Sequence, residues 1–317
     1  MLSRTADHLY WLARYVERAE NTARLMDVTT RMAMLPQTPA LTEQNWGAVL
    51  STTGLSLPYL KRHGGLHPAA VLHFMALDGD NPSSLLSVVR SARENAHAVR
   101  GALTAEMWES LNSTWLDLKA MGDEHLEGDL LPRFFDWVKS RALLFRGITE
   151  ATLLRDEAWQ FIELGRHVER ADNTARLVDV KYHILLPSAD EVGGAGDYYQ
   201  WGALLKAVSA FENYRKVYRD ALTPLRVAEL LLLNADLPRS LHACLNAVQA
   251  AIHGLAPNGE AARQAGDLHA HLHFARIDLI FSDGLHEWLD DVLARLSTLH
   301  GQIGREFLLP APQPEYA

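Results

Sequence analysis

The sequence predicts an all-α protein, an internally duplicated helical bundle with pseudo-twofold symmetry. Ala and Leu dominate the chain, and Gly and Pro cluster at breaks between segments with helical periodicity. No alternating apolar and polar run is long enough to predict a strand. One charged segment occurs twice, which indicates a repeated unit.

The helical segments follow from the apolar periodicity and from the residues that begin and end helices. Pro82 suits the start of one helix, Thr104 suits the N-cap of the next, and an interruption is expected at Pro58. The expected helices cover, in order, residues 3–34, 46–63, 67–77, 83–103, 104–121, 132–153, 156–185, 198–222, 225–234, 239–255, 260–282 and 285–307.

The duplication is clearest in the charged segment. Residues 12–28, LARYVERAENTARLMDV, align with residues 164–180, LGRHVERADNTARLVDV, and 13 of the 17 positions are identical. The chain is therefore expected to contain a first helical repeat, residues 1–150, and a second, residues 151–317, packed as one compact unit.

The similarity continues beyond this segment with a small drift in register. WGAVL at Trp46 matches WGALL at Trp201, and NPSSL at Asn81 matches LPRSL at Leu237. The whole unit is therefore expected to repeat with the same order of helices, and residues near the pseudo-twofold axis should meet their own counterparts.

The charged segments supply the candidate site residues. Plotted at about 100° per residue, the polar side chains of each copy gather on one face, opposite an apolar stripe. The candidates are Arg14, Glu17, Arg18, Asn21 and Arg24 in the first copy and Arg166, Glu169, Arg170, Asn173 and Arg176 in the second.

Three interpretations of these residues remain open. They form a buried ion-pair network that fixes the helix register, they bind an anion or peptide, or they are catalytic. A Glu flanked by Arg residues stays ionised and is a poor general acid, whereas Arg binds carboxylate or phosphate in a bidentate manner. Each Glu is expected to pair with at least one Arg of the set, on helices that pack near each other at the centre.

Composition excludes several function classes. The formal net charge is -9 and the pI is near 5.9, with no basic block, so no nucleic-acid partner and no anionic membrane surface is expected. The longest apolar run, AELLLLNA, is too short to span a bilayer. The N-terminal segment lacks the apolar core of a signal peptide, which predicts a cytoplasmic protein.

The sequence predicts no metal and no cofactor. Cys244 is the only cysteine, and its apolar surroundings predict a buried small hydrophobe. His269 and His273 share a helix face without an evident third ligand, and Glu94-x-x-His97 occurs once where a carboxylate di-metal site needs two such pairs. No nucleotide-binding loop or nucleophile motif is present in the sequence.

The opening, MLSRTADHLYWLARYVERAENTARLMDV, resembles the start of the alpha-E domain family, bacterial all-helical proteins named for a Glu-Arg motif. ARENAHAVRGALTAEMWESLN and FIELGRHVERADNTARL are also similar to segments of that family. The resemblance covers nearly the full length, and it puts the motif on Glu17–Arg18 and again on Glu169–Arg170.

The resemblance implies a function through the family's genomic setting. Its members are encoded beside, or fused to, a circularly permuted ATP-grasp protein, with a transglutaminase-like peptidase nearby. It therefore implies an accessory or substrate-holding partner of that ATP-grasp ligase, in ATP-dependent amide or peptide bond formation with a peptide or amino-acid acceptor. The alternative is an enzyme in its own right, acting on an anionic or peptide substrate through the Glu-Arg motifs.

Overall fold

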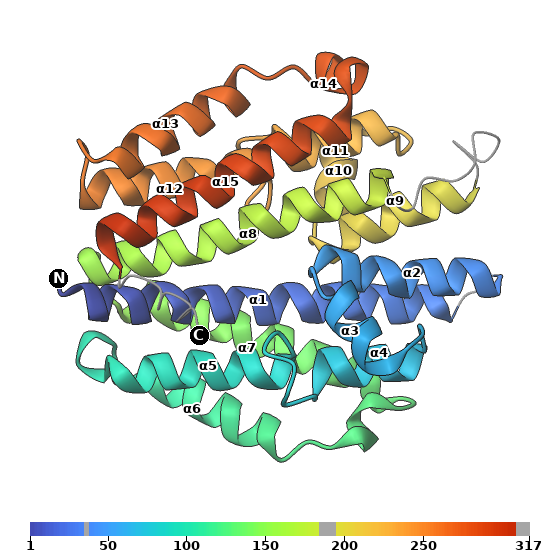
Figure 1. Cartoon of the computed structure of the whole chain (residues 1–317), viewed down its shortest axis with the longest axis horizontal. Helices are drawn as coiled ribbons and strands as arrows, with labels where there is room; N and C mark the ends of the chain where they lie inside the picture. The colour runs from blue at the N-terminus through green and yellow to red at the C-terminus, as the bar shows by residue number, and fades with distance from the viewer. Residues whose placement is uncertain (35–37, 184–194, 309–317) are drawn as a thin grey trace, which may run out of the picture.

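The computed structural model describes residues 1–34, 38–183 and 195–308, and these residues are helical throughout, with turns and loops between the helices and no strand (Figure 1). The all-α prediction is confirmed. The last two residues of the helix expected at 156–185 lie outside the described residues.

The helices follow one another with short connections. In order they are α1 (Ser3–Ala33), α2 (Pro39–Thr52), α3 (Ser56–His63), α4 (Pro68–Ala76), α5 (Leu85–Ala98), the 3-10 turn η1 (Arg100–Ala102), α6 (Ala105–Lys119), the 3-10 turn η2 (Asp123–Leu126), α7 (Leu130–Thr152), α8 (Glu157–His183), α9 (Ala195–Ala207), α10 (Phe211–Tyr218), α11 (Pro224–Leu232), α12 (Leu241–Leu255), α13 (Glu260–His273), α14 (Ile277–Asp283) and α15 (Leu285–Phe307).

The helices form two groups that meet along α1 and α8. In Figure 1, α5, α6 and α7 pack below α1, while α12, α13 and α15 pack above α8. Helices α2 and α9 lie side by side where α1 and α8 end, and α2 also contacts α8 while α9 contacts α1. The predicted central position of the two charged helices is confirmed, because each buries residues on more than one face.

The lengths and spacing of the helices recur along the chain. Helices α3 and α10 have 8 residues each, α4 and α11 have 9 each, and α7 and α15 have 23 each. Their first residues differ by 155, 156 and 155 positions respectively (211 − 56, 224 − 68 and 285 − 130). The lengths and the spacing of these three helices therefore agree between the part of the chain after α1 and the part after α8.

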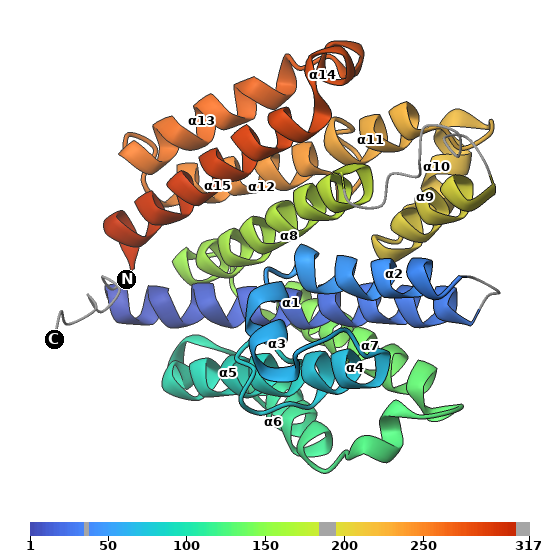
Figure 2. The same cartoon turned by 45° about the vertical axis from the view of Figure 1, so that its right-hand side comes forward.

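Helices α1 and α8 run in the same direction (Figure 1) and come into close backbone contact at Tyr10 and Gly165. A Cβ atom on Gly165 would overlap the backbone carbonyl oxygen of Tyr10, so only glycine permits this contact. Figure 2 shows α8 rising away from α1 toward the end where α2 and α9 lie. There Leu25 and Leu177 line a small apolar cavity of about 60 Å³ between the four helices.

Three helices are shorter than the sequence predicts. The break in residues 46–63 falls at Gly54, which has φ of 70°, and not at Pro58, which lies in the first turn of α3. A proline is tolerated there because that turn leaves its amide groups unpaired. Ser209, with φ of 54°, separates α9 from α10, and residues 274–276 separate α13 from α14.

The predicted N-caps are partly correct. Thr104 is confirmed, since its side chain accepts a hydrogen bond from the amide of Met107 at 3.3 Å. The preceding helix begins later than expected, because Ser84 caps it by accepting from the amide of Ser87 at 3.1 Å, and Pro82 lies before this cap. A capping hydroxyl supplies the acceptor that proline lacks.

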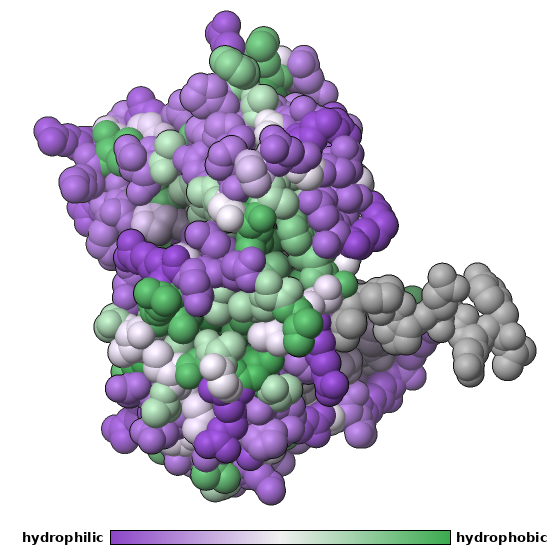
Figure 3. Space-filling model, turned by 90° about the vertical axis from the view of Figure 1, so that its left-hand side faces the viewer, coloured by the Kyte–Doolittle hydropathy of each residue, from purple (hydrophilic) through white to green (hydrophobic). Residues whose placement is uncertain are grey.

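The end of the molecule around the N-terminus carries apolar side chains. Figure 3 shows them gathered across the middle of this face within a largely polar surface. Leu2 and Leu154 are 78% and 76% exposed. In the part of the chain that the structure describes, no helix combines the length and apolarity needed to cross a membrane.

Candidate functional site

The motif residues of α1 and α8 form reciprocal ion pairs. Glu17 accepts hydrogen bonds from Nε and Nη2 of Arg170 at 2.8 and 2.7 Å. Glu169 accepts from Nε and Nη2 of Arg18 at 2.5 and 3.0 Å. The motif glutamate of each helix is thus held by the motif arginine of the other, and the predicted pairing of each Glu with an Arg of the set is confirmed.

The cluster around Glu17 is sealed. A second arginine, Arg239, donates to Glu17 at 3.0 Å and to Asn21 at 2.8 Å, and it lies 2.6 Å from Glu20. The side chains of Glu17 and Arg170 are only 3% and 6% exposed. Burial alone would raise the pKa of Glu17, but the adjacent guanidinium groups outweigh it and hold this pKa well below its usual range.

The cluster around Glu169 faces a cavity. Glu169 also accepts from Nε of Arg14 at 2.7 Å, and the side chain of Arg18 is 27% exposed. Burial raises the pKa of Glu169, but the guanidinium groups of Arg14 and Arg18 lower it by more. The pKa of Glu169 therefore lies below its usual value. The cavity, of about 440 Å³, lies between α1, α8, α15 and the segments that follow α2 and precede α5. Six predicted site residues line it: Arg14, Arg18, Asn21, Glu169, Asn173 and Arg176.

One substitution between aligned segments explains the difference between the clusters. In the alignment of NPSSL with LPRSL, Ser83 stands opposite Arg239. Arg239 extends into the sealed cluster and occupies the space beside Glu17. Ser83 lines the cavity and is too short to fill it. The cavity beside Glu169 is therefore open, whereas a guanidinium group fills the space beside Glu17.

The cavity presents both signs of charge. Its ionised side chains are Arg14, Arg18 and Arg176 against Glu169 and Asp172, three positive and two negative, or a net charge of +1. Arg176 pairs with Asp172 at 2.8 Å and remains 43% exposed. Nδ2 of Asn21 is buried and makes no hydrogen bond within the described residues. A ligand with a carboxylate and an amine would find partners for both groups here.

Sequence reasoning missed His300, which α15 contributes to the same cavity. Its Nδ1 lies 2.8 Å from the hydroxyl of Tyr10, and Nη1 of Arg14 lies 3.3 Å away. Burial and the positive charge of Arg14 lower the pKa of His300 to about 4, so its imidazole is neutral at physiological pH. No motif marks this residue in the sequence, because it lies 286 positions from Arg14.

Two predicted candidates pair with neither motif glutamate. Arg24 pairs with Glu20 at 2.7 Å, one turn away on its own helix. Arg166 pairs with Glu163 and not with a motif glutamate. Its aligned counterpart Arg14 does pair with a motif glutamate, Glu169, at 2.7 Å.

The cysteine and histidine predictions have different outcomes. Cys244 is fully buried, as expected, and burial raises the pKa of its thiol to about 12. The expectation of no third ligand for His269 and His273 is wrong, because the fold brings His242 of α12 beside them.

The fold and the site together define a class of protein. It is an all-helical protein whose two central helices exchange Glu-Arg ion pairs beside a polar cavity. The chain belongs to the Alpha-E family, described as a predicted alpha-helical domain with a conserved ER motif, and the match covers residues 1–308.

The chain is also similar to curated relatives in mycobacteria. Uncharacterized proteins of Mycobacterium bovis and of two strains of Mycobacterium tuberculosis are each 25% identical to it over 314 residues. The match covers 92% of this chain and 35% of each relative, so the chain spans about a third of their length. No solved structure matches the chain significantly.

Proposed function

We propose that this protein holds a peptide or amino-acid acceptor in the cavity beside Glu169. In this role it is an accessory partner of a circularly permuted ATP-grasp ligase that forms amide or peptide bonds. The observation that carries the proposal is the unequal pair of motif clusters: Arg239 closes one, and Ser83 leaves the other open.

The chemistry of the cavity favours an acceptor of this kind. Its volume of about 440 Å³ lies within the range of about 300–1,000 Å³ of small-molecule sites. Arg176 and Asn21 offer hydrogen-bond donors to a carboxylate or carbonyl group, while Asp172 and Asn173 offer acceptors to an amine. A simple anion would use only the donors and leave the carboxylate of Asp172 facing it.

Family membership supports the ligase partner. The resemblance implies a genomic setting beside an ATP-grasp protein, and in the mycobacterial relatives the matching segment is joined to nearly twice its own length of further polypeptide. Both the genomic setting and the additional polypeptide are consistent with a domain that supplies an acceptor substrate to the active site of another domain or protein. Dependence on ATP places the pair in the cytoplasm.

We also infer that the chain is a tandem duplication, with residues 1–150 and 151–317 related by a pseudo-twofold axis. The recurrence of helix lengths supports this inference, as do the reciprocal pairs of Glu17 with Arg170 and Glu169 with Arg18. Equivalent residues meet across a twofold axis in this way.

The alternative is an enzyme in its own right, acting on an anionic or peptide substrate at the same cavity. The position of His300 at the cavity wall favours it, since an unprotonated imidazole can accept a proton, but its pKa of about 4 makes it a weak base at neutral pH. The lowered pKa of Glu169 opposes it, because two guanidinium groups hold this carboxylate ionised and leave it no proton to donate. The accessory role requires no side chain of the cavity to accept or donate a proton, and we therefore prefer it.

Replacement of Ser83 tests the proposal. Ser83→Arg places a guanidinium in the open cavity as Arg239 does in the sealed one, and Ser83→Ala keeps the cavity open as a matched control. Calorimetric titration with free amino acids and dipeptides should show a ligand that binds the unmodified chain and Ser83→Ala but not Ser83→Arg.

The same three proteins would be added to the ATP-grasp protein encoded beside this chain, with ADP release as the readout. The unmodified chain and Ser83→Ala should stimulate release in the presence of the acceptor, and Ser83→Arg should not. Equal stimulation by all three would contradict the proposal.

A further inference from the structure

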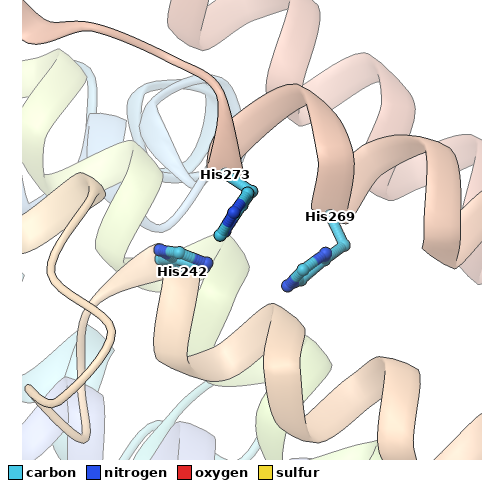
Figure 4. A group of neighbouring side chains, drawn as sticks. All are labelled: His242, His269 and His273. Carbon is cyan, nitrogen blue, oxygen red and sulfur yellow. The ribbon is translucent and has the colours of Figure 1, made fainter.

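Three histidines meet between α12 and α13. His242 lies in the first turn of α12, and His269 and His273 lie one turn apart on α13. Figure 4 shows the three rings gathered in the space between these two helices. One ring nitrogen from each lies within 4.8 Å of the other two.

Two of the rings are held with a lone pair available. Nδ1 of His242 is 3.0 Å from the carbonyl oxygen of Leu233 and donates to it, which leaves Nε2 unprotonated. Nε2 of His269 is 2.7 Å from Oδ1 of Asn246 and donates to it, which leaves Nδ1 unprotonated. Such carbonyl partners orient histidines that bind metals. His273 is exposed and can turn either nitrogen inward.

Metal ions bind the unprotonated nitrogen of an imidazole, and the hydrogen bonds of His242 and His269 leave one such nitrogen on each of these two rings. A second triad, Asp179, His286 and Asp290, differs from it: His286 pairs with Asp179 at 2.6 Å, and this ion pair accounts for the arrangement.

We propose that His242, His269 and His273 bind one divalent transition metal ion, with Zn²⁺ as the preferred ion and the fourth position open to water. Imidazole nitrogen suits zinc, copper and nickel and disfavours magnesium and calcium. In a tetrahedral site with Zn–N of about 2.0–2.1 Å, the nitrogens lie about 3.3 Å apart. Binding therefore draws the rings together by up to about 1.5 Å, which the exposed His273 permits.

The bound ion would connect α12 to α13 and leave a coordination position facing solvent. That position would take water or an oxygen ligand. The site is separate from the Glu-Arg cavity, and none of its three residues lines it. The inference therefore does not depend on the proposed function.

Zinc titration of the tag-free, full-length chain tests this inference. After treatment with a chelator and dialysis, the protein would compete with a chromophoric zinc indicator, and the thermal midpoint would be measured with and without Zn²⁺. We expect one Zn²⁺ per chain and a raised midpoint, because a ligand that binds only the folded state stabilises it.

The variants His273→Ala and His269→Ala should each lose at least about 100-fold in zinc affinity, since loss of even an outer partner costs about 10–100-fold. Both avoid the buried His242. His271→Ala is the matched control, because His271 lies on the same helix but stacks on Trp288. It should bind zinc as the unmodified chain does. Equal affinity in all four proteins, or no zinc binding by the unmodified chain, would overturn the site.

Discussion

Replacing each motif glutamate by glutamine should destabilise the protein unequally. Glu17→Gln leaves Arg170 without its counter-charge and Arg239 with that of Glu20 alone, and the side chains of Arg170 and Arg239 are only 6% and 10% exposed. Removing one partner of a buried ion pair costs about 3–5 kcal/mol. Glu169→Gln leaves Arg14 and Arg18, but Arg18 is 27% exposed at the cavity and can be hydrated. We expect a smaller loss there, of about 1–3 kcal/mol.

Urea unfolding followed by circular dichroism would measure both losses, with an unchanged m-value as the check that only stability has changed. In a thermal scan, a loss of about 3 kcal/mol corresponds to a midpoint roughly 6 °C lower, at ~2 °C per kcal/mol for a chain of this size. An unchanged midpoint for Glu17→Gln would refute the buried network. Equal losses for both variants would refute the distinction between a sealed and an open cluster.

Three further predictions follow from the geometry. The pKa values of Glu17 and Glu169 are lowered on folding. Their ionised carboxylates therefore contribute fully to stability above the ordinary pKa of 4.5, and this contribution declines as the pH falls below 4.5. Unfolding midpoints measured from pH 7 to pH 3 should fall more steeply for the unmodified chain than for Glu17→Gln. Gly165→Ala should cost about 1–3 kcal/mol in the same urea assay, because its methyl group would overlap the carbonyl oxygen of Tyr10, and an unchanged stability would show that the helices do not touch there. Cys244 should resist a thiol reagent in the native state and react once urea unfolds the chain, since it is fully buried and its pKa is about 12; rapid native labelling would contradict its position.

The helices were predictable because each follows local rules, and the errors lie where local rules are ambiguous. The apolar periodicity identifies residues 198–222 as helical but does not reveal the break at Ser209. Serine adopts positive φ far less often than glycine, so a serine in the sequence does not indicate a left-handed turn. At residues 46–63 both Pro58 and Gly54 could interrupt the helix, and the left-handed turn falls at Gly54 because glycine adopts positive φ most readily.

The site was predictable in part for a related reason. The ion pairs follow from residue types at fixed spacing on two helices that had to be central. The alignment shows that Arg239 stands opposite Ser83. It does not show that Arg239 pairs with Glu17, because these two residues lie 222 positions apart and meet only in the folded chain. His242 was missed beside His269 for the same reason, since only the packing of α12 on α13 joins them.

The close contact at Gly165 makes the junction of α1 and α8 a pivot. The helices touch there and separate toward their C-terminal ends, so the cavity lies along the widening arms. Arg176 is 11 residues from the pivot, or about 16 Å along the helix axis at ~1.5 Å per residue. A small change in the angle at Gly165 is therefore magnified at the cavity wall. Residue 165, which does not line the cavity, would thus affect how wide the cavity opens.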